Sequence, residues 1–205
     1  MYQPKHFAMT EHAAMVAVMQ RHPFATLVTC GDDGMHINHL PLLYTETSGG
    51  AVLRGHIARG NRLWQRRLAH AVAVFQGPDA YISPSWYPDK QVHGRVVPTW
   101  NYQVVHAQGQ LSFPEDGDWF AAHLRDLVDR FEQPRDDPWS IDDAPHDYLQ
   151  KMQRGIVGVE LVVESLSGKH KASQNKSDEE RAGIRAGLEA QGRSGGTAAL
   201  LSGLS

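Results

Sequence analysis

Two apolar segments joined by a short glycine-containing loop constrain the fold of this chain more than any other feature. Phe24–Cys30 and Met35–Tyr44 flank the tetrapeptide Gly31-Asp32-Asp33-Gly34. Glycine and aspartate tolerate the positive φ angles that tight connections between antiparallel strands require. The pattern predicts a β-hairpin, and with it an antiparallel sheet.

Further short apolar segments extend this predicted sheet. We expect strands over residues 51–56, 71–76, 80–83, 100–113 and 157–163. In the last of these, apolar residues occupy every second position from Val157 to Val163, as in a half-buried strand. The spacing is typical of an antiparallel meander and not of βαβ units. We therefore predict a mainly β fold of the α+β class with peripheral helices, arranged as a closed or split antiparallel β-barrel. An α+β sandwich is the alternative.

Helices are predicted around this sheet. Their ranges are 11–20, with Thr10 as the N-cap, 61–69, 118–132, 147–153 and 178–190. The third is amphipathic, with its apolar face formed by Phe120, Leu124, Leu127, Val128 and Phe131. Ser177 and Glu180 form a capping box that opens the last helix. We expect one domain over residues 1–191 and a flexible C-terminal tail over residues 192–205, which is rich in Gly, Ser and Ala.

Composition narrows the classes of function. A net charge of −3 over 205 residues gives no overall attraction to polyanions, so a nucleic-acid contact would have to be local. The single cysteine, Cys30, excludes an internal disulfide framework, and its apolar neighbours predict a buried strand thiol. The apolar patch Ala13–Met19 is too short to span a membrane. These features predict a cytoplasmic protein.

The twelve histidines do not predict a metal site. His36 and His39 have an odd separation within a predicted strand, so they should face opposite sides of the sheet. The remaining histidines form no HExxH motif and no His/Cys cluster. We therefore expect no dedicated metal site.

A strand-to-helix junction at residues 55–61 is suited to an anion. The sequence Gly-His-Ile-Ala-Arg-Gly-Asn ends a predicted strand and opens a predicted helix. Such junctions expose free backbone N–H groups, and Arg59 adds a fork of donors that fits phosphate. Arg62, Arg66 and Arg67 fall at helical spacing from Arg59. For these three we favour a solvated basic face, and for Arg59 the anion site.

Two further segments carry candidate binding residues. Gly77–Tyr102 concentrates tryptophans and tyrosines among prolines and glycines, which suits either a planar ring system or a loop anchored by aromatic side chains. Lys169–Asn175 gathers cationic, amide and hydroxyl groups that could hold a phosphate, or form an ordinary polar loop. The chain has no Gly-x-Gly-x-x-Gly, Walker or Gly-x-Ser-x-Gly motif, so dinucleotide, nucleoside-triphosphate and serine-hydrolase functions are not supported.

Six sequence blocks together resemble the PaiB family, the FMN-binding negative transcriptional regulators. They are MYQPKHF at the start, HLP at 39–41, GHIARGN at 55–61, FQGPDAYISPSWY at 75–87, VPTWNY at 97–102 and KHKASQNKS at 169–177. The resemblance extends to about Leu188. It implies a split β-barrel of the type shared with pyridoxamine-phosphate oxidases and flavin reductases, working as a homodimer with FMN near the subunit interface.

The resemblance also implies which residues bind FMN. Ala58, Arg59 and Asn61 would hold the phosphate with His56 at the rim, in agreement with the anion-site argument. The other implied contacts are Lys171, Ser173, Gln174 and Asn175 for phosphate or isoalloxazine, Trp86, Tyr87, Trp100 and Tyr102 for the ring pocket, and His39 and Asn101 as polar groups facing it. Arg62-Leu63 departs from the family pattern, where a proline is expected after Asn61.

Two functions follow from this likeness. The first is a flavin-binding transcriptional regulator that senses flavin or a redox state, and the alternative is a flavin-dependent oxidoreductase using the same FMN site. DNA is a candidate partner of the regulator. However, the sequence shows no helix-turn-helix, and only residues 59–67 and 169–185 are locally basic. Haem or metal binding through the histidines is disfavoured by their spacing.

Overall fold

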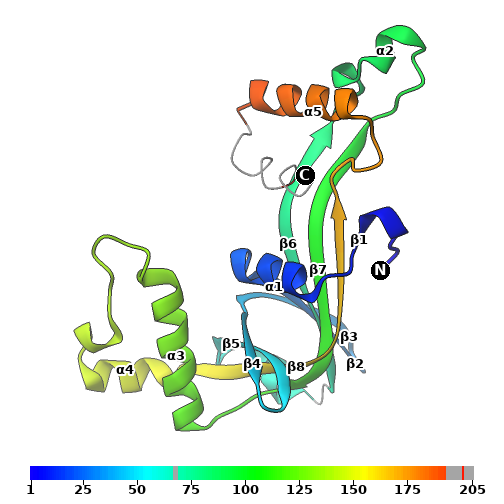
Figure 1. Ribbon diagram of the computed structural model, residues 1–205. Helices are drawn as coiled ribbons and strands as arrows, with labels where there is room; N and C mark the ends of the chain where they lie inside the picture. Colours follow the sequence, from blue (N-terminus) through cyan, green and yellow to red (C-terminus); the bar gives the residue numbers. More distant parts are fainter. Residues whose placement is uncertain (67–68, 193–199, 201–205) are drawn as a thin grey trace. The chain divides into compact units, whose positions relative to one another are not determined.

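The computed structural model of the chain describes residues 1–66, 69–192 and 200 (Figure 1). Its contacts divide the chain into two compact units. The terminal unit contains Met1–His22, Phe75–His106 and Ser167–Ser205, and the central unit contains Pro23–Val74 and Ala107–Leu166. Three long strands, β6 (His70–Ile82), β7 (Thr99–Ser112) and β8 (Ile156–Lys171), contribute residues to both units.

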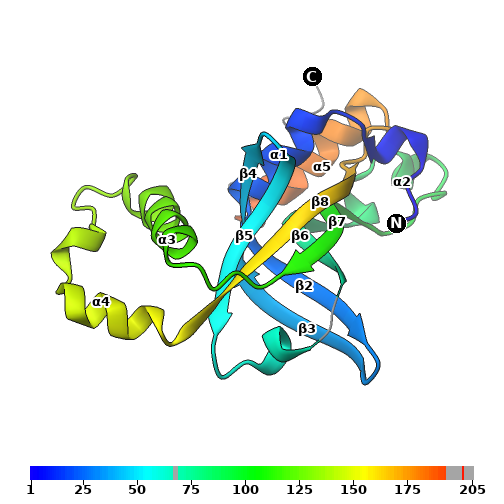
Figure 2. The same cartoon turned by 90° about the horizontal axis from the view of Figure 1, so that it is seen from below.

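The central unit is built on the predicted hairpin. Its other strands are β2 (Phe24–Gly31), β3 (Gly34–Pro41), β4 (Leu43–Thr47) and β5 (Gly50–Ala58). The hydrogen-bonded order of the sheet is β3-β2-β6-β7-β8-β5-β4, and β3 and β4 are the last strands on either side (Figure 2). β2 and β3 pair antiparallel with Gly31 opposite Gly34, as the sequence predicted.

Several strand boundaries differ from the prediction. The last strand was expected over residues 157–163, whereas β8 continues to Lys171. The expected strand 35–44 is broken at Leu42, because Pro41 has no N–H to continue the ladder and the Leu42 N–H donates to the carbonyl of Pro23 at 2.9 Å. The expected strands 71–76 and 80–83 form one strand, β6. Gly77 does not make a turn: a Cβ there would lie 2.9 Å from Cβ of Gln103, so the glycine allows β7 to approach closely.

Of the predicted helices of the central unit, 118–132 and 147–153 are confirmed within a residue, whereas 61–69 is not. The helical elements of this unit are η2 (Arg62–Gln65), α3 (Gly117–Glu132), η4 (Ile141–Asp143) and α4 (His146–Gln153). The predicted helix 61–69 is a single 3-10 turn, capped by the side chain of Asn61. On α3 the buried residues are Phe120 and His123, whereas Phe131 is 40% exposed. The apolar periodicity therefore identified the helix but missed His123 on its inner face.

The terminal unit packs helices against the far ends of the long strands. Its remaining elements are η1 (Lys5–Phe7), β1 (Ala8–Met9), α1 (His12–Arg21), η3 (Pro84–Trp86), α2 (Asp89–Val92) and α5 (Asp178–Ala190). β1 pairs with β8, with Ala8 opposite Lys169. Glu11, and not Thr10, is the N-cap of α1, and it makes no side-chain capping bond. The predicted capping box of Ser177 and Glu180 opens α5.

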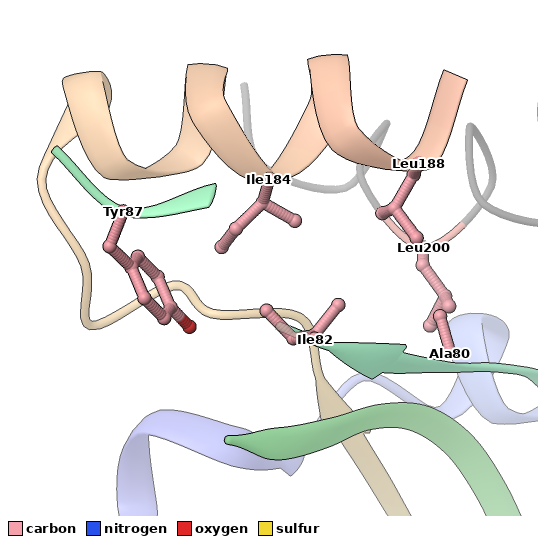
Figure 3. Close-up of a cluster of buried hydrophobic side chains, with 6 residues drawn as sticks. All are labelled: Ala80, Ile82, Tyr87, Ile184, Leu188 and Leu200. Carbon is pink, nitrogen blue, oxygen red and sulfur yellow. The ribbon is translucent and has the colours of Figure 1, made fainter. Parts of the chain in front are cut away.

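A small apolar core joins α5 to β6 (Figure 3). It is formed by Ala80, Ile82, Tyr87, Ile184, Leu188 and Leu200. Trp86 packs beside it, against Gly183 and Gly187 of α5: an added Cβ would lie 2.1 Å from the Trp86 carbonyl oxygen at Gly183 and 2.3 Å from its ring at Gly187. Two glycines in one helix therefore make room for one tryptophan.

Three sequence expectations concern exposure or the chain end. Cys30 is exposed and not buried, because strand alternation turns Ala25, Leu27 and Thr29 inward and Cys30 outward. The predicted flexible tail, residues 192–205, lies outside the described residues apart from Gly192 and Leu200. Among the described helices, none is long and apolar enough to cross a lipid bilayer.

We expect Gly187→Ala to destabilise the protein although alanine is the better helix former. The clash with the Trp86 ring should cost about 1–3 kcal/mol, which exceeds the gain in helix propensity of up to about 1 kcal/mol. Gly117→Ala is the matched control, since no atom lies within 4 Å of a Cβ at that helical position. Urea unfolding measures both variants, and equal stability of the two would contradict the packing described for Trp86.

Candidate functional site

The predicted FMN contacts divide between the two units. The central unit holds His39, His56, Ala58, Arg59 and Asn61. The terminal unit holds Trp86, Tyr87, Trp100, Asn101, Tyr102, Lys171, Ser173, Gln174 and Asn175.

The guanidinium of Arg59 binds protein acceptors with all of its nitrogens. Nε donates to the carbonyl of Arg154 at 2.9 Å, Nη1 to Glu115 at 3.0 Å and Nη2 to the carbonyl of Ile156 at 3.2 Å. The same group stacks over Trp64, 5.5 Å from the ring centroid. Arg59 therefore fastens the end of β5 to the start of β8, and a phosphate would have to displace some of these bonds.

Asn61 instead lines a polar cavity of about 270 Å³ between β3 and η2. The lining residues are Met35, His36, Ile37, Asn38, Asn61, Arg62, Leu63 and Arg66. Asn61 is held in place by two bonds: its Nδ2 donates to Oδ1 of Asn38 at 2.6 Å, and its Oδ1 accepts from the N–H of Leu63 at 3.1 Å. Most of the polar groups around this cavity are donors or cations.

One carboxylate moderates the charge near this cavity. Asp33, in the hairpin loop, accepts hydrogen bonds from His36 and from Arg66, and these bonds lower the pKa of its carboxyl to about 2. Arg62, by contrast, forms no hydrogen bond or ion pair with any residue in the described part of the chain. Cationic donors therefore remain available to an anion in the cavity.

A pair of histidines lies on the inner side of α3. Nδ1 of His56 and Nε2 of His123 are 3.1 Å apart. His123 is 1% exposed, its Nδ1 has no hydrogen-bond partner among the described residues, and its ring lies over Trp119 at 5.0 Å. Trp119 in turn donates from Nε1 to Glu160, which pairs with Arg54 at 2.8 Å.

Burial decides the protonation of this pair. If His56 donated from Nδ1, the proton of neutral His123 would sit on its buried Nδ1 without an acceptor, which is rarely tolerated. We therefore assign the donor to His123 Nε2, with the proton of His56 on Nε2. Burial, followed by the nearby His56 and Arg54, lowers the pKa of His123 to about 4, and burial also lowers the pKa of His56.

The outward face of the hairpin is apolar and exposed. Phe24, Met35 and Ile37 are 67%, 73% and 61% exposed. They share this face with Cys30 and His39, because the register places Thr26 opposite His39 and Cys30 opposite Met35. His39 bonds to Thr26 at 3.1 Å and stacks on Phe24, whereas His36 faces the other way and binds Asp33. The predicted separation of the two histidines is confirmed.

In the terminal unit, a buried polar pair fixes the segment after β8. Asn101, 1% exposed, exchanges hydrogen bonds with Ser173, 4% exposed, at 3.0 and 3.2 Å. Ser173 has a φ of 60°, which is uncommon for a non-glycine residue and is maintained only by surrounding contacts. Gln174 closes the same turn by accepting from the N–H of Ala172 at 2.8 Å. Asn175 is exposed.

The aromatic residues of the terminal unit have different environments. Trp86 and Tyr87 contribute to the packing around α5. Trp100 is 53% exposed and meets Tyr81 edge-to-face at 5.9 Å. The ammonium of Lys169 lies over the ring of Tyr102, 5.4 Å from the ring centroid. Trp100 and Tyr102 are therefore available to a ligand, and Trp86 and Tyr87 are largely structural.

Several residues of these sites were not singled out from the sequence. The sequence predicts a solvated face for Arg62 and Arg66, and it marks no role for Asn38. Lys169 belongs to the polar segment 169–175 but is not among the implied FMN contacts. His123 was missed because the apolar residues of this helix already account for a buried face, and a histidine beside them adds no signal of its own. Its one sequence signal is position: His123 falls three residues after Phe120, on the buried face.

The fold is shared with solved flavoproteins. The flavocytochrome Anf3 from Azotobacter vinelandii aligns with a TM-score of 0.60 at 14% identity, covering 88% of this chain and 78% of that one. A FAD- and haem-binding protein from Mycobacterium smegmatis aligns with a TM-score of 0.58 at 16% identity, covering 85% and 78%. At such identities the likeness concerns the fold alone, and it confirms the predicted antiparallel split β-barrel.

Sequence relatives define the family. A family model described as "Putative FMN-binding domain" matches residues 1–165. The Bacillus subtilis protein named "Protease synthase and sporulation protein PAI 2" is 36% identical over 180 residues, covering 87% of this chain and 84% of that protein. An uncharacterized protein of Saccharomyces cerevisiae is 31% identical over 157 residues, covering 66% and 92%. The chain belongs to the PaiB family of FMN-binding domains, and FMN is its cofactor.

His123 makes stability depend on pH. The unfolded chain takes up a proton near pH 6.5 and the folded protein only near pH 4, so stability is full above about pH 6.5 and falls as the pH drops towards 4. The loss from this group is about 3 kcal/mol. We expect His123→Gln to flatten the pH dependence of urea unfolding over this range, and His146→Gln, at an exposed site, to leave it unchanged. Equal slopes for the two variants would show that His123 titrates normally.

Proposed function

We propose that the chain is an FMN-binding regulatory protein of the PaiB type, which acts as a homodimer in the negative control of transcription. The observation that carries the proposal is the family match over residues 1–165 together with a relative named for protease synthesis and sporulation. FMN supplies a redox-active ring, through which such a protein can sense flavin or redox state. The alternative function, an oxidoreductase, uses the same cofactor. In that case the electrons of the reduced flavin pass to a substrate.

Within the central unit, the cavity lined by Asn61, Arg62 and Arg66 is the best candidate for the FMN phosphate. Two guanidinium groups with free donors, an amide and the imidazole of His36 fit a dianion through charge-assisted hydrogen bonds. Arg59 does not line this cavity, and its nitrogens already bind protein acceptors. Trp100, Asn101 and Tyr102 stay assigned, by the family resemblance, to the ring of a flavin bound by the dimer.

Replacing both Arg62 and Arg66 by alanine should weaken the binding of FMN. The binding of riboflavin, which lacks the phosphate, should be unaffected. Each lost charge-assisted bond costs about 1.5–3 kcal/mol, so the loss of two should lower FMN affinity by about 100-fold or more. The absorbance and fluorescence changes on titrating each flavin into the purified protein measure the two affinities.

Arg59→Ala is the matched control for this experiment. Because Arg59 bonds to protein groups, its loss should lower the midpoint of thermal unfolding and leave the ratio of FMN to riboflavin affinity near that of the unchanged protein. If the ratio of FMN to riboflavin affinity falls strongly in Arg59→Ala and is unchanged in the double variant, Arg59 and not the Arg62/Arg66 cavity binds the phosphate.

The exposed face of the hairpin supports the homodimer. Monomeric proteins rarely leave a contiguous apolar patch of this kind uncovered. The apolar side chains and the thiol that point outward on β2, β3 and β6 are those of Phe24, Val28, Cys30, Met35, Ile37, Val72 and Val74. Met35 and Ile37 also line the cavity, whose volume is below the roughly 300–1,000 Å³ of ligand pockets. A second subunit on this face would cover the apolar patch and contact these two residues of the cavity.

We expect Ile37→Glu to produce a monomer. A charge buried without a partner in an apolar interface should raise the dimer dissociation constant on the order of 100-fold or more. Val92→Glu is the control, since Val92 is 77% exposed on α2 in the terminal unit. Analytical ultracentrifugation measures the oligomeric state, and maleimide labelling of Cys30 should become faster only in Ile37→Glu. A dimer that persists in Ile37→Glu would place the interface elsewhere.

The regulatory role can be separated from enzyme activity. Deleting the gene should raise target transcripts, and the Arg62→Ala, Arg66→Ala variant should fail to restore repression if flavin is needed. Titration of the protein into random duplex DNA at low salt tests direct contact with DNA. Rapid anaerobic bleaching of bound FMN by a nicotinamide nucleotide, with repression unaffected by the double variant, would favour the oxidoreductase instead.

A further inference from the structure

Two lysines at the end of β8 lie together in the terminal unit. Lys169 and Lys171 are separated by one residue in the strand, so their side chains point to the same side. Lys169 is 8% exposed and Lys171 is half-buried. The intervening His170 points the other way, where its Nε2 bonds to the carbonyl of Leu200 at 3.0 Å.

No acidic side chain pairs with either lysine in the described part of the chain. The Lys169 ammonium donates to the carbonyl of Tyr2 at 3.2 Å, and the Lys171 ammonium donates to the hydroxyl of Thr99. The residues outside the description contain no Asp or Glu, since none follows Glu189 and positions 67 and 68 are Arg and Leu. Two neighbouring cations are therefore uncompensated by any side-chain anion.

Aromatic rings surround these ammonium groups. Lys169 lies 5.6 Å from the ring centroid of Tyr2 and 5.4 Å from that of Tyr102, and Lys171 lies 5.9 Å from that of Phe7. A cation–π contact supplies about 0.5–2 kcal/mol, whereas desolvating an ammonium costs several kcal/mol. Burial, moderated by Tyr102 and reinforced by Lys169, lowers the pKa of Lys171. The rings alone do not offset the cost of placing both charges here.

Lys176, in the same unit, is a lysine whose charge is balanced by a carboxylate. It forms a 2.7 Å ion pair with Glu180 and lies 4.7 Å from the ring centroid of Tyr87. Lys169 and Lys171 have comparable aromatic neighbours and lack the carboxylate. Each ammonium has three N–H donors and bonds to one described acceptor, so donors remain for a further group.

We propose that Lys169 and Lys171 form a binding site for an oxyanion, a phosphate or a carboxylate, with Tyr2 and Tyr102 as its walls. The anion supplies the charge that the protein does not. Its source is either the phosphate of an FMN bound by the dimer or a separate small anionic ligand. The site deepens the proposed function in the first case and adds a second ligand in the other.

The sign of the stability change separates this site from a structural role. In phosphate-free buffer, Lys169→Met and Lys171→Met each keep the apolar stem and remove an uncompensated charge, so the midpoint of thermal unfolding should rise or stay unchanged. Lys176→Met removes a paired charge and should lower it. A clear fall in both Lys169→Met and Lys171→Met would show that these lysines are structural and would overturn the proposal.

Inorganic phosphate is the direct probe. At constant ionic strength, exchanging chloride for phosphate at about ten times its dissociation constant should raise the unfolding midpoint of the full chain by roughly 3–6 °C. Lys169→Met/Lys171→Met should lose a large part of this shift, and Lys176→Met should keep it. A shift that is absent from the unchanged protein, or equal in the double variant, would overturn the site.

Loading the protein with flavin identifies the source of the anion. If the lysine-dependent shift appears with riboflavin bound and disappears with FMN bound, the site takes the FMN phosphate, and the double variant should lose about tenfold of its preference for FMN over riboflavin. If the shift persists with FMN bound, the site takes a separate anion. Should the protein bind neither flavin, the proposed function fails, and the phosphate response of the flavin-free chain still decides the site.

Discussion

The two-residue side-chain period of the strands is the constraint on which the rest of this structure depends. In β2 it turns Ala25, Leu27 and Thr29 into the core and leaves the intervening positions for an exposed apolar face. In β8 it places Lys169 and Lys171 on one side and His170 on the other. The same backbone that builds the sheet therefore sorts each side chain into core, interface or binding surface, and a slip of one residue would exchange these roles.

Whether a cationic side chain has a carboxylate partner separates those that stabilise the fold from those suited to bind a ligand. Arg54, Arg59 and Lys176 each meet a carboxylate, and Arg59 also binds two backbone carbonyls. Their charges are used within the protein. Arg62, Lys169 and Lys171 have no such partner among the described residues, although the two lysines are wholly or partly withdrawn from water. Cationic side chains left in this state are the ones best suited to an anionic cofactor.

Sequence patterns predicted the elements better than the contacts between them. The hairpin, the alternating first half of the last strand, the capping box at Ser177 and the split barrel were predictable because turn chemistry, alternation and motif resemblance are local or family-wide signals. The partners of Arg59 were not, since Glu115 and the carbonyl of Arg154 lie far along the chain and no local pattern marks them. Cys30 was misjudged because an apolar run does not indicate which of its members face inward.

Flavin binding and subunit association are coupled if the hairpin face is the dimer interface. Met35 and Ile37 line the polar cavity and also belong to the exposed hairpin face, so a partner on this face would contact two residues of the proposed phosphate site. Linkage then requires that FMN tighten the dimer by the factor by which dimerisation tightens FMN. Such a protein would convert the supply of a small cofactor into a change of oligomeric state. A symmetric dimer can present paired surfaces that a monomer does not.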